Sequence, residues 1–173
     1  MQAPDYTVFV DGIYDLFHAG HENLFRQAIE KGKEFAGGRE VKLLVGVCGL
    51  GVAEYKRKTI MSLDERCAAV RTNSLVHGVI ENSPIRIDSE FLHKHKIDLV
   101  IHGDDFNKEK IDFYYGDAVE EGKFATVPYT KGVSTTDLIR QAKNEGSLPP
   151  QLASHVVETS ELVKRIQARC DLI

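Results

Sequence analysis

The clearest signal of secondary structure in this chain is VFVDGIYDLFHAGHENLFRQA, residues 8–28. It opens on an apolar run typical of a buried strand and closes on ENLFRQA, where apolar residues recur at helical spacing. HAGH (18–21) therefore falls after a predicted strand, in the opening turn of a predicted helix. A helix places His18 and His21 on one face of that turn.

The same alternation of strand and helix continues along the chain. Ser62 with Glu65 forms a capping-box pattern that starts a helix, and STTDLIRQAKNEG (134–146) has a hydroxyl cap and a Gly146 stop. Further helices are predicted over 22–35 and over 89–96, the latter capped by Ser89; strands are predicted over 6–10, 41–47, 75–80, 97–103 and 123–129. The pattern predicts an α/β fold: a parallel sheet with helices on both faces and ligands beyond the carboxyl ends of the strands.

The domain organisation follows from length and from two prolines. A chain of 173 residues has room for one domain with a full core and a short appendage. SLPPQ (147–151) breaks the chain, so we expect a domain over 1–146 and a helical tail over 147–173. The tail, HVVETSELVKRIQARCDLI, is typical of one amphipathic helix or two short ones.

Composition excludes several classes of function. A net charge of −4 with interspersed acids and bases gives no broad surface for nucleic acid. Three widely spaced cysteines form neither a metal pair nor a disulfide framework, which favours a reducing compartment. The start MQAPDYTVFV lacks a basic region followed by an apolar run, so we expect no signal peptide, and no run is long enough to insert stably in a membrane. We expect a cytoplasmic protein.

HAGH has three interpretations. A helix N-terminus directs free N–H groups and the positive end of its dipole at one place, so imidazole donors would extend an anion site there. Gly20 would let a ligand approach the backbone closely. A zinc site needs a third ligand at suitable spacing, and none nearby completes a recognised pattern. Alternatively, His18 and His21 are packed or simply exposed.

Two motifs carry a family resemblance. GIYDLFHAGH (12–21) resembles the HxGH signature of the nucleotidyltransferase superfamily, and GVSTTDLI (132–139) resembles the second signature of its cytidylyltransferase branch. Both occur in the expected order, with YK, DER and HGDD as landmarks between them. The resemblance runs from Tyr6 to Ile139 and does not cover the tail.

The resemblance implies a Rossmann-like fold and an enzyme that joins a phosphorylated alcohol to CTP and releases pyrophosphate, as a homodimer using Mg²⁺. It implies catalytic roles for His18, His21 and Lys56, the last lying ten residues before Arg66 as in the family. It assigns no metal ligand. The implied nucleotide-binding residues are Ile13, Tyr14, Gly20, Asp105, Lys131, Ser134, Thr135 and Thr136, and the implied acceptor-binding residues are Asp104 and Ile85.

Several of these residues also have a structural interpretation. A lysine such as Lys56 is most often a solvated loop charge, with Arg57 and Lys58 beside it. The hydroxyls of Ser134 to Thr136 can cap a helix as well as bind phosphate. Gly-Asp-Asp in HGDD suits a turn as well as a ligand edge, where the carboxylates would bind cytosine, a metal or an ammonium group.

One position departs from the family pattern. The chain reads PYTKGVSTT (128–136), with Tyr129 where the family has an arginine. A phenol offers no bidentate charged fork to a phosphate, and Lys131 is the nearest residue on the loop able to restore the charge. The alternatives are weaker CTP binding, or a non-catalytic nucleotide-binding module.

The acceptor is predicted from HGDDF and from the lack of tryptophan. A quaternary ammonium calls for an aromatic cage, and Ile85 stands where the phosphocholine branch commonly has an aromatic. HGDD instead resembles the phosphoethanolamine branch, so phosphoethanolamine is the first choice. Glycerol 3-phosphate remains an alternative, as does phosphocholine if Tyr114 or Tyr115 supplies a cage ring.

Overall fold

A computed structural model describes residues 4–49, 58–150, 152 and 156–172. Its described part forms one five-stranded parallel sheet in the order β3-β2-β1-β4-β5, and the predicted α/β class is confirmed. The elements in chain order are β1 (Tyr6–Gly12), α1 (Ala19–Phe35), β2 (Val41–Cys48), α3 (Leu63–Arg71), β3 (Gly78–Ser83), α4 (Ser89–Lys94), β4 (Leu99–Gly103), α5 (Lys108–Glu120), β5 (Phe124–Val127), α6 (Thr135–Glu145) and α7 (Thr159–Gln167).

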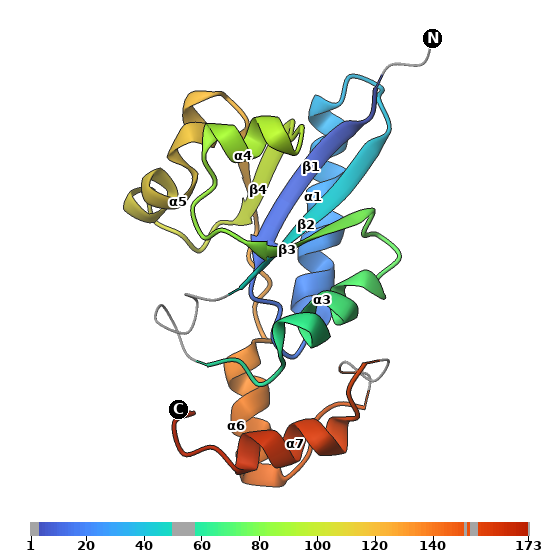
Figure 1. Cartoon of the computed structure of the whole chain (residues 1–173), viewed down its shortest axis with the longest axis vertical. Helices are drawn as coiled ribbons and strands as arrows, with labels where there is room; N and C mark the ends of the chain where they lie inside the picture. Colours follow the sequence, from blue (N-terminus) through green and yellow to red (C-terminus); the bar gives the residue numbers. More distant parts are fainter. Residues whose placement is uncertain (1–3, 50–57, 151, 153–155, 173) are drawn as a thin grey trace.

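Alternating side chains of the sheet divide its packing between two faces. On one face Val8 and Val10 of β1 pack with residues of α1 and α3, including Phe25 and Val70. On the other face Phe9 packs with residues of α4 and α5. The predicted cover of helices on both faces is therefore confirmed, and Figure 1 shows α4 and α5 across the sheet from α1.

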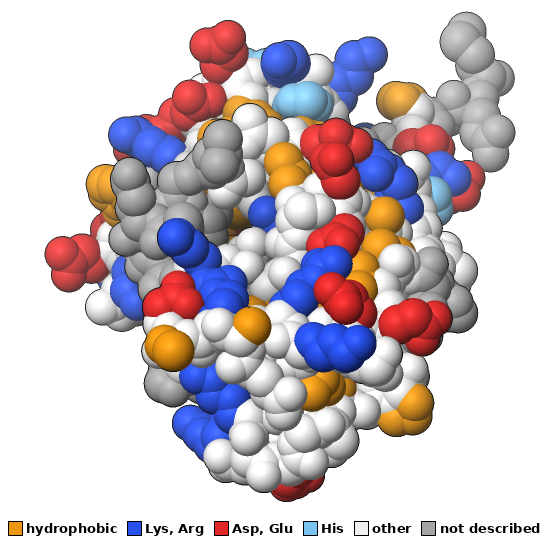
Figure 2. Space-filling view, turned by 60° about the horizontal axis from the view of Figure 1, so that its bottom comes forward, with side chains coloured by type: hydrophobic (Ala, Val, Ile, Leu, Met, Phe, Trp, Pro, Cys, Tyr) orange, Lys and Arg blue, Asp and Glu red, His pale blue; other side chains and the backbone are white. Residues whose placement is uncertain are grey.

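A third apolar cluster joins α6 and α7 beyond the carboxyl ends of the strands (Figure 1). Leu138 and Ile139 of α6 pack there with Leu162 and Ile166 of α7, all four buried. Figure 2 brings this end of the molecule forward and shows basic and acidic side chains interspersed on its surface. In the described part of the tail one helix forms, α7.

Several boundaries were predicted wrongly. The strand expected over 97–103 begins at Leu99, and the strand expected over 123–129 is limited to Phe124–Val127. The strand expected over 75–80 begins at Gly78, because Leu75 and Val76 lie in a turn after α3, where their apolar side chains are partly buried. The cap of α4 is Asp88, whose carboxylate accepts the Phe91 N–H at 2.8 Å, and not Ser89. The helix ends at Lys94 because Lys96 has a left-handed φ of 52°.

Sequence reasoning missed α5 altogether. Its middle is aromatic and contains Gly116, so its helical signal in the sequence is weak. In the structure Tyr115 has non-helical backbone angles, which mark a kink in this helix. The sheet nevertheless requires a crossover there, because β4 and β5 are parallel neighbours. By contrast, the Ser62–Glu65 capping box and the Ser134 and Gly146 caps are confirmed.

Candidate active site

A cavity of about 320 Å³ opens at the carboxyl edge of the sheet, between β1 and β4. The strand order reverses direction between these neighbours, which is where α/β sheets of this kind bind ligands. Asp11 and Gly12 line it from β1, and His102 and Gly103 line it from β4. The topology therefore places the cavity where the strand pattern predicted it.

The N-termini of two helices meet at this cavity. His18, Gly20 and His21 of α1 line it together with Ser134, Thr135 and Thr136 of α6. A Cβ atom built on Gly20 would lie 3.2 Å from Val133, so the two termini are in close approach. Two positive dipole ends thus converge on one space, which makes it suited to a polyanion.

The two histidines cap α1 reciprocally. His18 Nδ1 accepts the Gly20 N–H at 3.1 Å, and His21 Nδ1 accepts the His18 N–H at 3.2 Å. Their rings stack with centroids 3.8 Å apart, and His21 also packs against Tyr14 and Phe17. The histidines are therefore packed and capping residues that also line the cavity.

Burial fixes the charge of these imidazoles. It lowers the pKa of His18 to about 4 and the pKa of His21 well below its usual value, with the neighbouring His18 as a second cause for His21. Both rings are neutral at neutral pH, and because each Nδ1 is an acceptor, the proton of each ring is assigned to Nε2. Within the described residues, no group of three His, Cys, Asp or Glu side chains could hold a metal, so zinc gains no third ligand there.

The loop between β1 and α1 is held in a strained shape. Tyr14 and Leu16 have left-handed φ values of 55° and 49°, which bulky residues rarely adopt. Buried side chains stabilise the loop: Arg66 donates to Ile13 O at 2.7 Å, and Asp15 accepts two backbone N–H groups from residues 60 and 61. The loop held in this way places Ile13, Tyr14 and Asp15 in the cavity wall.

Asp11 is a site residue that sequence reasoning missed. Its carboxylate accepts the Tyr115 hydroxyl at 2.9 Å, and burial raises its pKa to about 6, against the lowering effects of His102 and of that hydrogen bond. The signal for it was present, because Asp11 is the polar end of an apolar strand at the ligand edge. His102, Thr59 and Tyr129 line the cavity as well.

Of the other predicted site residues, some line the cavity and others do not. Asp105 lines the cavity, whereas Asp104 accepts the Tyr129 N–H at 2.9 Å and is not in its wall. Ile85 packs against the cluster around Phe9, and Lys131 is exposed; neither lines the cavity. Lys56 lies outside the described residues.

The residues of the STT motif (134–136) make hydrogen bonds that stabilise the fold, and they also line the cavity. Ser134 Oγ accepts the Asp137 N–H at 3.1 Å as the cap of α6, and Thr135 Oγ1 donates to Asp15 O at 3.1 Å. Thr136 is exposed at the cavity. Both the capping and the lining interpretations therefore describe this motif.

Comparison with solved structures supports the fold. The chain resembles the crystal structure of the lipopolysaccharide core biosynthesis protein from Thermoplasma volcanium GSS1, with a TM-score of 0.54 and 17% sequence identity over 74% of this chain and all of that one. At this identity the likeness concerns the fold alone. No helix within the described ranges has the length and apolar character needed to cross a bilayer.

Comparison of sequences gives the family. The chain is 37% identical over 134 residues to choline-phosphate cytidylyltransferase A of Rattus norvegicus, covering 76% of this chain and 35% of that protein. It is 32% identical over 161 residues to ethanolamine-phosphate cytidylyltransferase of Saccharomyces cerevisiae, covering 92% of this chain and 48% of that protein. The chain thus spans about a third to a half of the length of these relatives. A cytidylyltransferase-like family model matches residues 9–141, and the chain belongs to the cytidylyltransferase-like family.

Proposed function

We propose that this chain catalyses transfer of CMP from CTP to a phosphorylated alcohol, giving a CDP-alcohol for phospholipid synthesis and pyrophosphate. The observation that carries the proposal is the convergence of HAGH and STT, on two helix N-termini, at one cavity. Cytidylyltransferase names among the relatives support the same reaction.

The reaction balances without a strong base. A phosphomonoester oxygen of the acceptor attacks the α-phosphorus of CTP, an O–P bond forms there, and the bond to the β-phosphate breaks with its electron pair leaving on pyrophosphate. The nucleophile is already mostly dianionic near neutral pH, since its second pKa is about 6. Catalysis then consists of positioning and of stabilising charge on the transferring group.

The residues of the cavity supply those needs. The neutral rings of His18 and His21 donate through Nε2–H to oxygens of the reacting phosphates, and the termini of α1 and α6 add backbone donors. Gly20 keeps the approach open. We assign Lys56 the role of bridging both substrates on the family resemblance alone, because it lies outside the described residues.

Mg²⁺ fits this site as a partner of the nucleotide. The described residues contain no three-ligand group for a metal, and Mg²⁺ characteristically keeps water and phosphate ligands beside one or two carboxylates. We propose that it is bound chiefly by CTP phosphates, with Asp105 as the nearest carboxylate of the HGDD motif in the cavity wall. When bound, it neutralises triphosphate charge. EDTA should abolish turnover, and rescue by Zn²⁺ but not Mg²⁺ would contradict this assignment.

Phosphoethanolamine is the proposed acceptor. A primary ammonium donates hydrogen bonds, and Asp11 lines the cavity as a carboxylate that is not assigned to the metal. Tyr114 and Tyr115 are buried and do not line it, so the described residues give no cage from these rings for a quaternary ammonium. Phosphocholine stays the second candidate because Phe106 and Tyr129 place two other rings in the wall.

The test is a panel assay with CTP and each of phosphoethanolamine, phosphocholine and glycerol 3-phosphate, followed by pyrophosphate release. The proposal expects the highest kcat/KM with phosphoethanolamine. Release with none of the three, despite CTP binding, would favour a non-catalytic nucleotide-binding module. We also propose a homodimer, which light scattering on the purified chain would test.

A further inference from the structure

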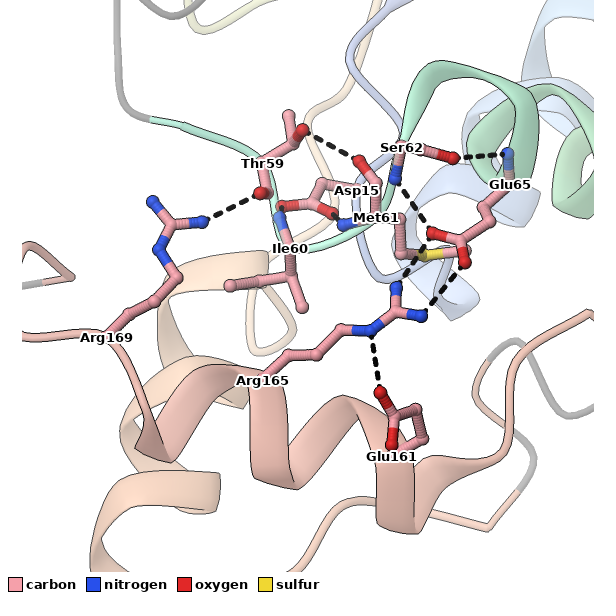
Figure 3. Close-up of polar contacts among 9 residues, drawn as sticks. All are labelled: Asp15, Thr59, Ile60, Met61, Ser62, Glu65, Glu161, Arg165 and Arg169. Atoms are coloured by element: carbon pink, nitrogen blue, oxygen red, sulfur yellow. Dashed lines mark hydrogen bonds and ion pairs between the residues drawn. The ribbon is translucent and has the colours of Figure 1, made fainter.

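Two arginines near the C-terminal end of the chain face the segment 59–62 and the start of α3 (Figure 3). Arg165 lies on α7 and Arg169 lies just after it. Their side chains are about a third and a fifth exposed, at 32% and 21%. Segment 59–62 connects to the cavity, because Thr59 is part of its wall.

Arg165 makes a bidentate pair with Glu65. Its two terminal nitrogens donate to the two Glu65 carboxylate oxygens at 2.8 and 3.1 Å, and its Nε donates to Glu161 at 3.1 Å. The same Glu65 carboxylate accepts the Ser62 N–H at 2.8 Å in the capping box of α3. The hydrogen bond from Arg165 is the main cause that lowers the pKa of Glu65. Arg165 therefore orients the Glu65 carboxylate, which in turn caps the N-terminus of α3.

Arg169 holds a single peptide unit from one side. It donates to Thr59 O at 2.8 Å and is itself oriented by a fork of two hydrogen bonds to Asp171, at 3.0 and 2.8 Å. The N–H of that same peptide unit belongs to Ile60 and donates to Asp15 at 2.9 Å. The unit between Thr59 and Ile60 is thus clamped between the tail and a buried carboxylate of the cavity wall.

Asp15 links segment 59–62 to both the HAGH and the STT motifs of the site. Its carboxylate also accepts the Met61 N–H at 3.0 Å, and its backbone oxygen accepts the Thr135 hydroxyl of the STT motif. Asp15 precedes His18 by three residues in the strained loop. Displacing segment 59–62 would therefore move the loop before HAGH and the start of α6.

Apolar packing follows the same route. Leu16, Ile60 and Met61 are buried in one cluster with residues of α6 and α7. Leu16 lies beside Asp15 in the loop, so the tail covers the loop as well as the segment that hydrogen-bonds to it. The tail therefore makes both polar and apolar contacts with segment 59–62.

We propose that Arg165 and Arg169 are positioning residues for the nucleotide half of the site. Through Glu65, Thr59 and Asp15 they keep the loop before HAGH and the STT turn in register with one another. This inference rests on the proposed function for its kinetic consequence, whereas its structural consequence can be measured without any turnover.

The experiment compares Arg165→Ala, Arg169→Ala and the double variant with Lys164→Ala. Lys164 is an exposed residue on the same helix, so its variant removes the same charge without touching segment 59–62. We expect the KM for CTP to rise by about 3- to 30-fold in the double variant, a range typical of indirect coupling. The KM for the acceptor should change much less, and Lys164→Ala should match the wild type.

A second measurement does not depend on catalysis. Hydrogen exchange of the Ile60 and Met61 amides should quicken in the arginine variants and not in Lys164→Ala, because these amides donate to Asp15. Arg165→Lys and Arg169→Lys, which keep the charge but lose the fork, should give smaller changes in both readouts. They also provide a folded series if the alanine variants unfold.

The outcomes separate the two proposals. A wild type without CTP turnover, together with faster amide exchange in the variants, would defeat the proposed function and leave the clamp intact. Folded arginine variants with wild-type KM for CTP and unchanged exchange would overturn the positioning role. A uniform loss of activity with unchanged KM values and a lowered Tm would show that the arginines only stabilise the fold.

Discussion

His21 Nδ1 accepts the backbone N–H of His18 at 3.2 Å, so the second histidine of HAGH caps the residue that carries the first. His18 in turn caps Gly20. Each ring uses Nδ1 for the helix, which assigns the proton to Nε2 and gives each ring a donor there for a ligand. In each ring, Nδ1 therefore caps the helix, and Nε2 is the nitrogen that can donate to a ligand.

This division can be tested with His18→Asn. Asparagine is a good N-cap, so the variant should keep the start of α1 while losing the Nε2 donor. We expect kcat to fall by about 10²–10³, typical for a lost donor to transition-state charge, with little change in Tm. Asp88→Ala, which removes the cap of α4 instead, should lower stability by about 1 kcal/mol and leave kcat unchanged. Normal turnover in His18→Asn would show that the histidine is only a cap.

The pH dependence of kcat/KM for CTP should lack a histidine limb near pH 6.5. Burial lowers the pKa of His18 to about 4, and that of His21 well below 6.5, so both rings stay neutral in the free protein across pH 6–8. Initial rates at low CTP in a constant-ionic-strength buffer series would measure this. A limb at pH 6.5 that disappears in His18→Asn would contradict the neutral assignment.

Asp11 should instead control acceptor binding. Its raised pKa of about 6 means that it is ionised at pH 7.5 and loses its charge as the pH falls through 6, so KM for phosphoethanolamine should rise there. Asp11→Asn should raise that KM at pH 7.5 and remove the part of the limb due to the carboxylate. A limb left in the variant belongs to the substrate phosphate, whose own second pKa is also about 6. An unchanged KM in Asp11→Asn would exclude an ammonium contact.

Ionisation of Asp11 should destabilise the folded protein. A carboxyl whose pKa is raised on folding holds its proton more tightly in the folded state, so its ionisation costs stability as the pH rises from about 4 to 6. The wild type should therefore lose stability relative to Asp11→Asn over that interval. Urea unfolding of both proteins at pH 4.5 and pH 7.5 would measure the difference.

Gly20→Ala should separate helix stability from function. The added Cβ would lie 2.9 Å from His18 Cε1 and 3.0 Å from its Nδ1, so the ring must move. We expect a large loss of kcat/KM, although alanine is by itself a better helix former than glycine by about 1 kcal/mol. Wild-type kinetics in this variant would mean that the position of the His18 ring is unimportant.

Lys131→Ala tests whether this lysine replaces the missing family arginine. The compensation hypothesis expects a higher KM for CTP, although Lys131 is exposed and does not line the cavity. Tyr129 does line it, so Tyr129→Arg should tighten CTP binding by about 1–2 kcal/mol if the guanidinium reaches the phosphates. Unchanged CTP kinetics in Lys131→Ala would reject compensation, and calorimetry would measure the gain in Tyr129→Arg.

The features of this protein that could be predicted from its sequence are those that depend on local signals. The alternation of apolar runs and amphipathic helices predicts the parallel sheet, and capping patterns predict the starts of α3 and α6, because the residues that satisfy a helix terminus lie within one turn of it. HAGH and STT were likewise recognisable as contiguous motifs, and both line the cavity.

Contacts between segments that are distant in the chain could not be predicted from the sequence and follow from the tertiary structure. The helix α5 has a weak local signal and forms where the crossover from β4 to β5 requires one. The pairing of Asp11 with Tyr115 joins residues 104 positions apart, and that of Arg165 with Glu65 joins residues 100 apart. Neither pairing leaves a spacing signature, because the sheet order and the packing of α7 bring these groups together, and the raised pKa of Asp11 follows from the burial that results.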